Sequence, residues 1–169
     1  MVTTPQQQNN NIEYDTYATP FDVDLSTPKS EKFFEAYTIK VTSLPELIKN
    51  ILMDSSTAEF IEENLGPNFN LTPEQKIEIT RIIRDVLLGD LFIGEMLQNI
   101  SDRMKLLPDE ARKLGNLIVS ELFGPAIEDI KKMQIEKFPE KINRPIPEKP
   151  DLKIEPDINK NNIVDLRNK

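Results

Sequence analysis

The sequence contains no cysteine, no histidine and no tryptophan. Without cysteine the chain has neither a disulfide framework nor a thiolate nucleophile. Without histidine it lacks the most common general base and metal ligand, and its five scattered glycines form no Gly-rich loop of the kind that cradles phosphate. We therefore expect no enzymatic activity, no cofactor and no metal ion. A metal site built only from carboxylates is the one form of catalysis that this composition leaves open.

Long hydrophobic runs are missing as well. The most apolar stretch, Val86–Ile93, is interrupted by Asp90 and is much shorter than the roughly 18 residues that a membrane-spanning helix needs. The first twenty residues contain no basic start followed by an apolar run, so no secretory signal is predicted. We expect a chain without a membrane span, and the cytoplasm is the default location.

Positive charge is scarce in the middle of the chain. Residues 41–138 contain 11 Lys and Arg against 17 Asp and Glu, a net charge of −6 within a total of −8. A segment with this charge is repelled by phosphate backbones and by anionic membrane surfaces. Other proteins are therefore the expected partners, and direct binding to nucleic acid is not expected.

The central stretch, Leu71–Gly124, contains a repeat of 35 residues. Leu71–Gly89 aligns without a gap on Leu106–Gly124, and the register extends back to Ile48. Between residues 48–89 and 83–124 the identical positions are Ile48, Leu52, Asn64, Leu71, Pro73, Ile83, Leu87 and Gly89. Because these matches fall on apolar and turn residues, the period predicts a repeated pair of helices.

Helix boundaries follow from capping residues and apolar spacing. Thr72 is a favourable N-cap, and Pro73 fits the first helical position, where its missing N–H costs nothing. Gly89 fits a left-handed residue at a helix end, and the repeat places Asp54 and Gly124 at the same turn. Gly66, followed by proline, is expected to close an earlier helix. These signals predict three helical hairpins, which cover residues 44–65, 72–104 and 108–138.

The predicted fold class is therefore all-α, with about six helices in three hairpins. Three stacked two-helix units suffice for a short solenoid, and a compact orthogonal bundle fits the same spacing, so both arrangements stay open. We divide the chain into a flexible or extended N-terminal arm (1–40), a helical repeat domain (41–138) and a Pro-rich extended C-terminal tail (139–169). Within the arm, residues 30–41 are expected to form a short helix followed by an extended link.

The two ends carry apolar residues in polar surroundings. In the N-terminal arm these are Tyr14, Tyr17 and Phe21, which predict a short motif that docks on a partner. The alternative is that the arm packs along its own core. In the C-terminal tail, Ile163, Val164 and Leu166 follow a Pro-rich spacer, as in tethered docking peptides. The alternatives for this segment are that it folds back along the protein's own helices, or that its apolar residues are a chance cluster.

Two glycines and three large apolar residues raise the possibility of a groove that binds a ligand. Gly94 and Gly115 lie inside expected helices, where glycine costs roughly 1 kcal/mol relative to alanine. This cost favours close helix packing, or else a groove for a ligand. Met96, Met104 and Phe92 either line such a groove or belong to the core.

The functional hypothesis is a non-catalytic protein–protein interaction or accessory subunit. In this hypothesis a helical core carries extended arms that dock on partner subunits. The alternative is a helical domain that binds a peptide or small ligand in a groove between hairpins. The identity of the partner and the oligomeric state cannot be read from the sequence.

Overall fold

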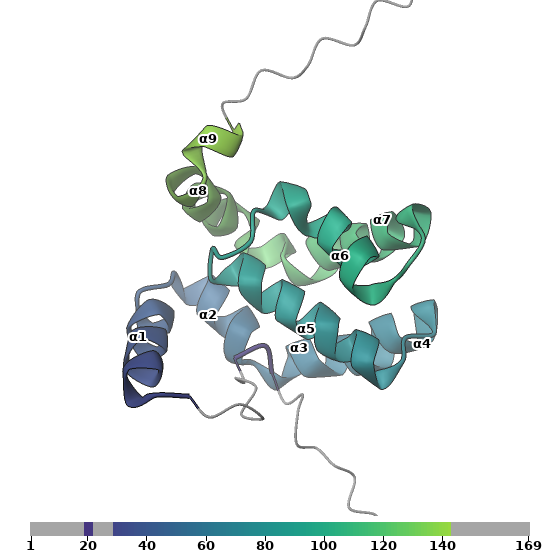
Figure 1. Cartoon of the computed structure of the whole chain (residues 1–169), viewed down its shortest axis with the longest axis horizontal. Coiled ribbons are helices and arrows are strands. Elements are labelled where there is room, and N and C mark those ends of the chain that lie inside the picture. The colour runs from purple at the N-terminus through teal and green to yellow at the C-terminus, as the bar shows by residue number, and fades with distance from the viewer. Residues whose placement is uncertain (1–18, 22–28, 143–169) are drawn as a thin grey trace, which may run out of the picture.

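Figure 1 shows the computed structural model, which describes residues 19–21 and 29–142. Within these ranges all regular secondary structure is helical, and no strand occurs. The all-α prediction is thus confirmed for the described part of the chain. Tyr14, Tyr17, Ile163, Val164 and Leu166, which were predicted to bind partners, lie outside the described residues.

The first half of the fold consists of two helices followed by a long helical run. Its elements are α1 (Glu31–Thr42), α2 (Glu46–Met53), α3 (Ser55–Glu59), the π-helical η1 (Phe60–Leu65), and α4 (Gly66–Phe69). The last three are contiguous and form one helical segment with a π-helical middle.

The second half begins with the longest helix and contains two short 3₁₀ turns and a second π-helical stretch. Its elements are α5 (Pro73–Leu87), η2 (Ile93–Glu95), α6 (Met96–Met104), α7 (Pro108–Leu117), the π-helical η3 (Ile118–Leu122), η4 (Gly124–Ala126), α8 (Ile127–Lys137) and α9 (Pro139–Ile142).

Helix α5 lies at the centre of the packing. It contacts α6 on one side and α2 on another, and α6 in turn packs against α7 (Figure 1). The predicted apolar stripe of α5 is confirmed, since its five members are completely buried: Ile79, Ile82, Ile83, Val86 and Leu87. The predicted helix start is also confirmed by a capping box, in which Gln75 Oε1 accepts the N–H of Thr72 at 2.9 Å.

The helix ends differ from expectation at two places. The helical run does not close at Gly66 but continues to Phe69, and Pro67 lies where the π-helical η1 passes into α4. Asn70, with φ 49°, provides the left-handed end instead. The extended link expected near Tyr37–Val41 is also wrong. Helix α1 continues through Thr42, and the burial of Val41 in the core stabilises its last turn.

The turn positions that the repeat aligns have three different backbone geometries. Gly89 is left-handed, with φ 67°, as predicted. Gly124 is not left-handed and begins the 3₁₀ turn η4, while Asp54 is extended and caps α3. The corresponding helices also end differently, because α5 stays regular to Leu87 whereas α7 passes into η3. The sequence period is therefore not matched by an identical backbone at these turns.

Candidate functional site: the groove between α1 and α5

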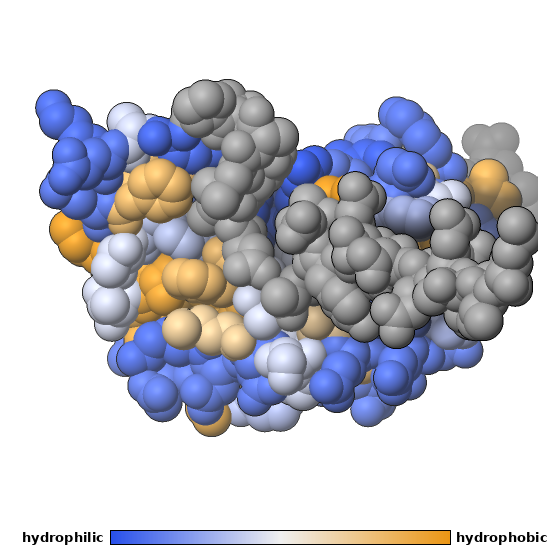
Figure 2. Space-filling view, turned by 90° about the horizontal axis from the view of Figure 1, so that it is seen from below, coloured by the Kyte–Doolittle hydropathy of each residue, from blue (hydrophilic) through white to orange (hydrophobic). Residues whose placement is uncertain are grey.

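Helix α1 lies at the edge of the fold and buries only one of its twelve residues, Val41. Phe33, Phe34 and Ile39 are 37%, 41% and 69% exposed. Figure 2 shows apolar surface gathered on the α1 side of the molecule, with hydrophilic residues around it. Because an isolated helix of this length is marginal in water, α1 depends on contacts outside itself.

Aromatic side chains form a cluster, defined as Phe21, Phe33, Phe34 and Tyr37, on α1 and the segment beside it. The ring of Phe33 stacks on Tyr37 at 6.0 Å and meets Phe34 edge to face at 5.5 Å. Phe21 lies 5.6 Å from Tyr37. Pairs with these spacings are favourable beyond the area that they bury, so the cluster stiffens the exposed edge of the fold.

Two hydrogen bonds hold Phe21 on its own chain. Its backbone N–H donates to the carbonyl of Leu52 at 2.9 Å, and its carbonyl accepts from the hydroxyl of Tyr37 at 2.8 Å. Pro20, beside it, is buried. Of the residues predicted to bind a partner, Phe21 is the one that the structure describes, and its surroundings correspond to the alternative in which the arm packs along its own core.

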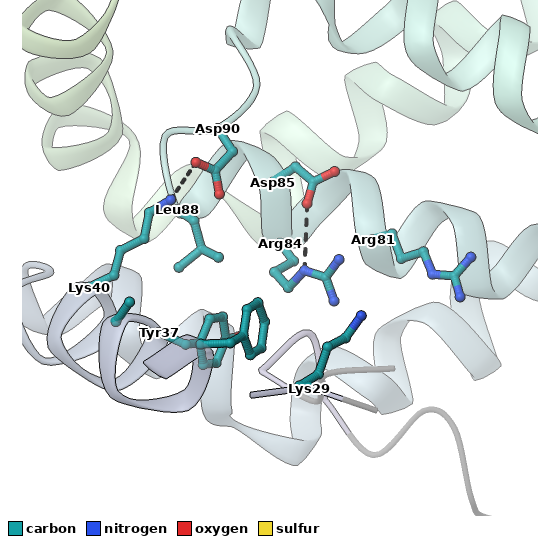
Figure 3. Close-up of a pocket in the computed structure, with 10 residues that line it drawn as sticks. Lys29, Tyr37, Lys40, Arg81, Arg84, Asp85, Leu88 and Asp90 are labelled. Carbon is teal, nitrogen blue, oxygen red and sulfur yellow. Dashed lines mark hydrogen bonds and ion pairs between the residues drawn. The ribbon is translucent and has the colours of Figure 1, made fainter. Parts of the chain in front are cut away.

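A groove of about 470 Å³ opens between α1 and α5. Figure 3 shows Lys29 and Tyr37 entering it from the α1 side and Arg84 and Leu88 from the α5 side. The groove has four cations, two carboxylates and an apolar floor, which are supplied by Lys29, Lys40, Arg81, Arg84, Asp85, Asp90, Phe33, Ala36, Tyr37 and Leu88. Its lining thus carries a formal charge of +2 in a chain of −8.

The two carboxylates of the groove are engaged with neighbouring cations. Asp90 forms an ion pair with Lys40 across the groove. Asp85 lies 3.5 Å from Arg84 and 3.3 Å from Arg103, which reaches it from α6. The acids therefore position the basic side chains, and the lining remains cationic.

A third carboxylate, Glu78, lies just outside the groove and anchors its α5 wall. It pairs with Arg81 at 2.5 Å and with Arg103 at 2.8 Å. Partial burial raises the pKa of Glu78, but the hydrogen bonds and charges of Arg103 and Arg81 outweigh burial and leave its pKa below the usual 4.5. Glu78 is thus held ionised, and it fixes Arg81 beside the groove.

The glycines of the alternative hypothesis do not border this groove. A Cβ at Gly115 would lie 2.2 Å from Leu97, so the close approach expected there is present between α7 and α6. Gly94 lies in η2 against the ring of Phe92, which would be 2.5 Å from a Cβ at that position. Met96 and Met104 are buried in the core. The space at Gly115 is therefore filled by the chain itself, and neither glycine lines the groove between α1 and α5.

Metal-binding clusters and membrane spans are absent from the part of the chain that the structure describes. Residues 19–21 and 29–142 contain no group of three or more Asp and Glu side chains placed to hold a metal ion. No helix in these ranges has the length and apolar character to cross a membrane.

Sequence reasoning missed the groove because it assigned most of α1 to the N-terminal arm. The signal was present in the spacing. Lys29, Phe33, Tyr37 and Lys40 recur at intervals of four, four and three, which puts them on one helical side. Arg81, Arg84 and Leu88 on the α5 side have the same kind of spacing, but only the tertiary fold brings the two rows together.

In comparisons with protein families, curated proteins and solved structures, the chain matches none.

Proposed function

We propose that the chain is a non-catalytic protein–protein interaction or accessory subunit, with α1 as part of its binding surface. The observation that carries the proposal is the set of exposed apolar side chains on α1. Phe34 and Ile39 line a shallow hollow on the outer side of this helix, together with Glu31, Glu35 and Thr38. An apolar hollow rimmed by polar residues is typical of protein contact surfaces.

The energetics favour a partner on this side. Full burial of a Phe or Ile side chain contributes about 1.5–3 kcal/mol, and α1 retains only Val41 in the core. A partner that covers Phe34 and Ile39 would therefore stabilise α1 as it binds. Single exposed apolar residues are common in proteins, but here several lie within one short helix.

The test is an affinity purification from the native source with the full-length chain and a Phe34→Ser, Ile39→Ser variant. Partners recovered with the wild type should be lost from the variant. The matched control is Leu107→Ser, Ile135→Ser, which removes two similarly exposed apolar residues outside α1. If the α1 variant retains all partners, α1 is not part of the binding surface.

The arms form the second part of the proposal. Tyr14, Tyr17, Ile163, Val164 and Leu166 are proposed to dock on partner subunits, in line with their isolated apolar character in polar surroundings. Deletion of residues 1–18 and 150–169 should then weaken the binding of partners identified with the full-length chain. Unchanged affinity would show that the arms are not docking segments.

Peptide binding is the second candidate function. It is favoured by the groove between α1 and α5, which combines an apolar floor with convergent cations. Its location differs from the site near Gly94 and Gly115 that the sequence indicated.

A further inference from the structure

We infer that the groove between α1 and α5 binds an acidic peptide segment of a partner protein, in which apolar or aromatic residues lie among the carboxylates. This inference rests on the proposed interaction function and names the chemistry of the partner. It concerns a surface that is separate from the outer side of α1, so the two can be tested independently.

Charge complementarity is the first argument. Lys29 and Lys40 lie on the α1 side of the groove, and Arg81 and Arg84 lie on the α5 side. The carboxylates among them pair with Lys40, Arg84 and Arg103, and Glu78 outside the groove pairs with Arg81, so the lining itself keeps a formal charge of +2. A groove with net positive charge in an acidic chain attracts segments rich in Asp and Glu and repels basic ones.

The floor of the groove supplies the second argument. Phe33, Tyr37 and Leu88 present apolar surface between the two rows of cations. Lys29 lies 5.7 Å from the ring centre of Phe33, within the range of a cation–π contact. A ligand with negative charge alone would leave this floor uncovered, whereas acidic residues with an apolar residue between them would contact both the cations and the rings.

A partner protein explains more of the surface than a short segment of the same chain does. Phe33 lines the groove, and its edge-to-face neighbour Phe34 lines the hollow on the outer side of α1. A partner can bury both surfaces at once. The chain itself also carries acidic residues near apolar ones, namely Glu13 and Asp15 in residues 1–18 and Asp22 and Asp24 in residues 22–28, so these two segments are the competing occupants that an experiment has to separate.

The experiment selects random short peptides on the immobilised full-length chain, with counter-selection on an Arg81→Glu, Arg84→Glu variant. Selected peptides should be acidic and contain at least one aromatic or aliphatic residue. The best peptide, carrying a fluorescent label, is then titrated with each chain. Its Kd should weaken roughly tenfold in the charge-reversed variant, and binding should weaken with added salt because the contacts are partly exposed.

Two further variants separate a lost site from a lost fold. Lys29→Glu changes a groove cation that precedes α1, removes its contact with the Phe33 ring and leaves the ion pairs of α5 intact, so it should weaken binding while the thermal unfolding temperature changes little. Lys113→Glu places the same charge change on an exposed residue of α7 and should leave binding unchanged. If Lys113→Glu weakens peptide binding as much as Lys29→Glu does, the weakening reflects only the net charge of the chain. That result would overturn the inference.

Other outcomes overturn the assignment directly. Selection of basic or uncharged peptides, or binding that survives both groove variants, would remove the acidic segment as the ligand. Tighter binding of the peptide to a Glu13→Gln, Asp15→Asn chain, or to an Asp22→Asn, Asp24→Asn chain, would identify that segment of the same chain as the occupant. Self-association lost on charge reversal, measured by sedimentation, would identify a second copy. If the groove variants leave peptide binding unchanged while Phe34→Ser, Ile39→Ser still loses partners, the proposed function stands without this inference.

Discussion

The side-chain carbonyl of Gln134 in α8 accepts a hydrogen bond from the backbone N–H of Ile93 at 2.9 Å. The amide of the same side chain donates to the carbonyls of Val86 and Leu91 at 3.3 and 3.1 Å. Gln134 is only 1% exposed. A single polar side chain of α8 thus satisfies three backbone groups around the turn that joins α5 to η2, and it sets the position of that turn.

We predict that Gln134→Leu destabilises the fold by about 2 kcal/mol, because one buried and two partly buried hydrogen bonds to the backbone are lost. The measurement is urea unfolding followed by circular dichroism. The control is Gln98→Leu, which removes an exposed amide that bonds to Asp102 and should change the unfolding free energy by less than about 0.5 kcal/mol. Equal losses in both variants would contradict the role given to Gln134.

Gly89 and Gly124 are aligned by the sequence repeat but differ in conformation, so alanine should separate them. Gly89→Ala should cost about 1–2 kcal/mol, because a side chain is strained at φ 67° and its Cβ would lie 3.2 Å from Lys137. Gly124→Ala should be neutral or slightly stabilising, since nothing lies within 4 Å of a Cβ there. Thermal unfolding of both variants provides the test, and equal costs would support matching turns.

Prediction from sequence succeeded where short-range signals decide the structure. In α5 the Thr72 cap, the first-turn Pro73 and the apolar spacing all indicate one helix, and the structure has that helix with the expected buried stripe. The left-handed Gly89 is a local signal of the same kind. These features follow from propensity and periodicity, and distant residues are not needed to explain them.

Prediction failed where contacts between distant residues decide the structure. The last turns of α1 are helical because Val41 packs into the core, although Tyr37–Val41 alternates like a strand. The groove needs α1 beside α5, and the buried Gln134 is recognised only when the carbonyls of Val86 and Leu91 face it. Local spacing places residues on one side of a helix, but it does not report which helices lie side by side.

The ion pairs of Glu78 predict a pH dependence of stability. The pKa of Glu78 is below its usual 4.5 in the folded chain, so its contribution is present above the pKa of the unfolded chain and is lost as the pH falls through the folded value. Glu78→Gln should lower the unfolding free energy at pH 7 and flatten its decline below about pH 4.5. The measurement is a series of urea unfolding curves across acidic pH.

The control for this series is Glu121→Gln, which changes an exposed carboxylate on η3. It should leave both the stability at pH 7 and the acid slope close to those of the wild type. A decline as steep in Glu78→Gln as in the wild type would show that the pairs with Arg81 and Arg103 contribute nothing to acid sensitivity.

The last prediction concerns the anchoring of Phe21. Tyr37→Phe keeps the ring but removes the hydroxyl that donates to the Phe21 carbonyl. Since a net hydrogen bond contributes about 1 kcal/mol, the amide of Phe21, which donates to Leu52, should exchange with deuterium about fivefold faster. The amide of Ile83, deep in α5, serves as the internal reference and should keep its rate. An unchanged rate at Phe21 would mean that its ring contact and the Leu52 bond suffice to hold the segment, whereas equal acceleration at both amides would mean that the substitution loosens the whole fold.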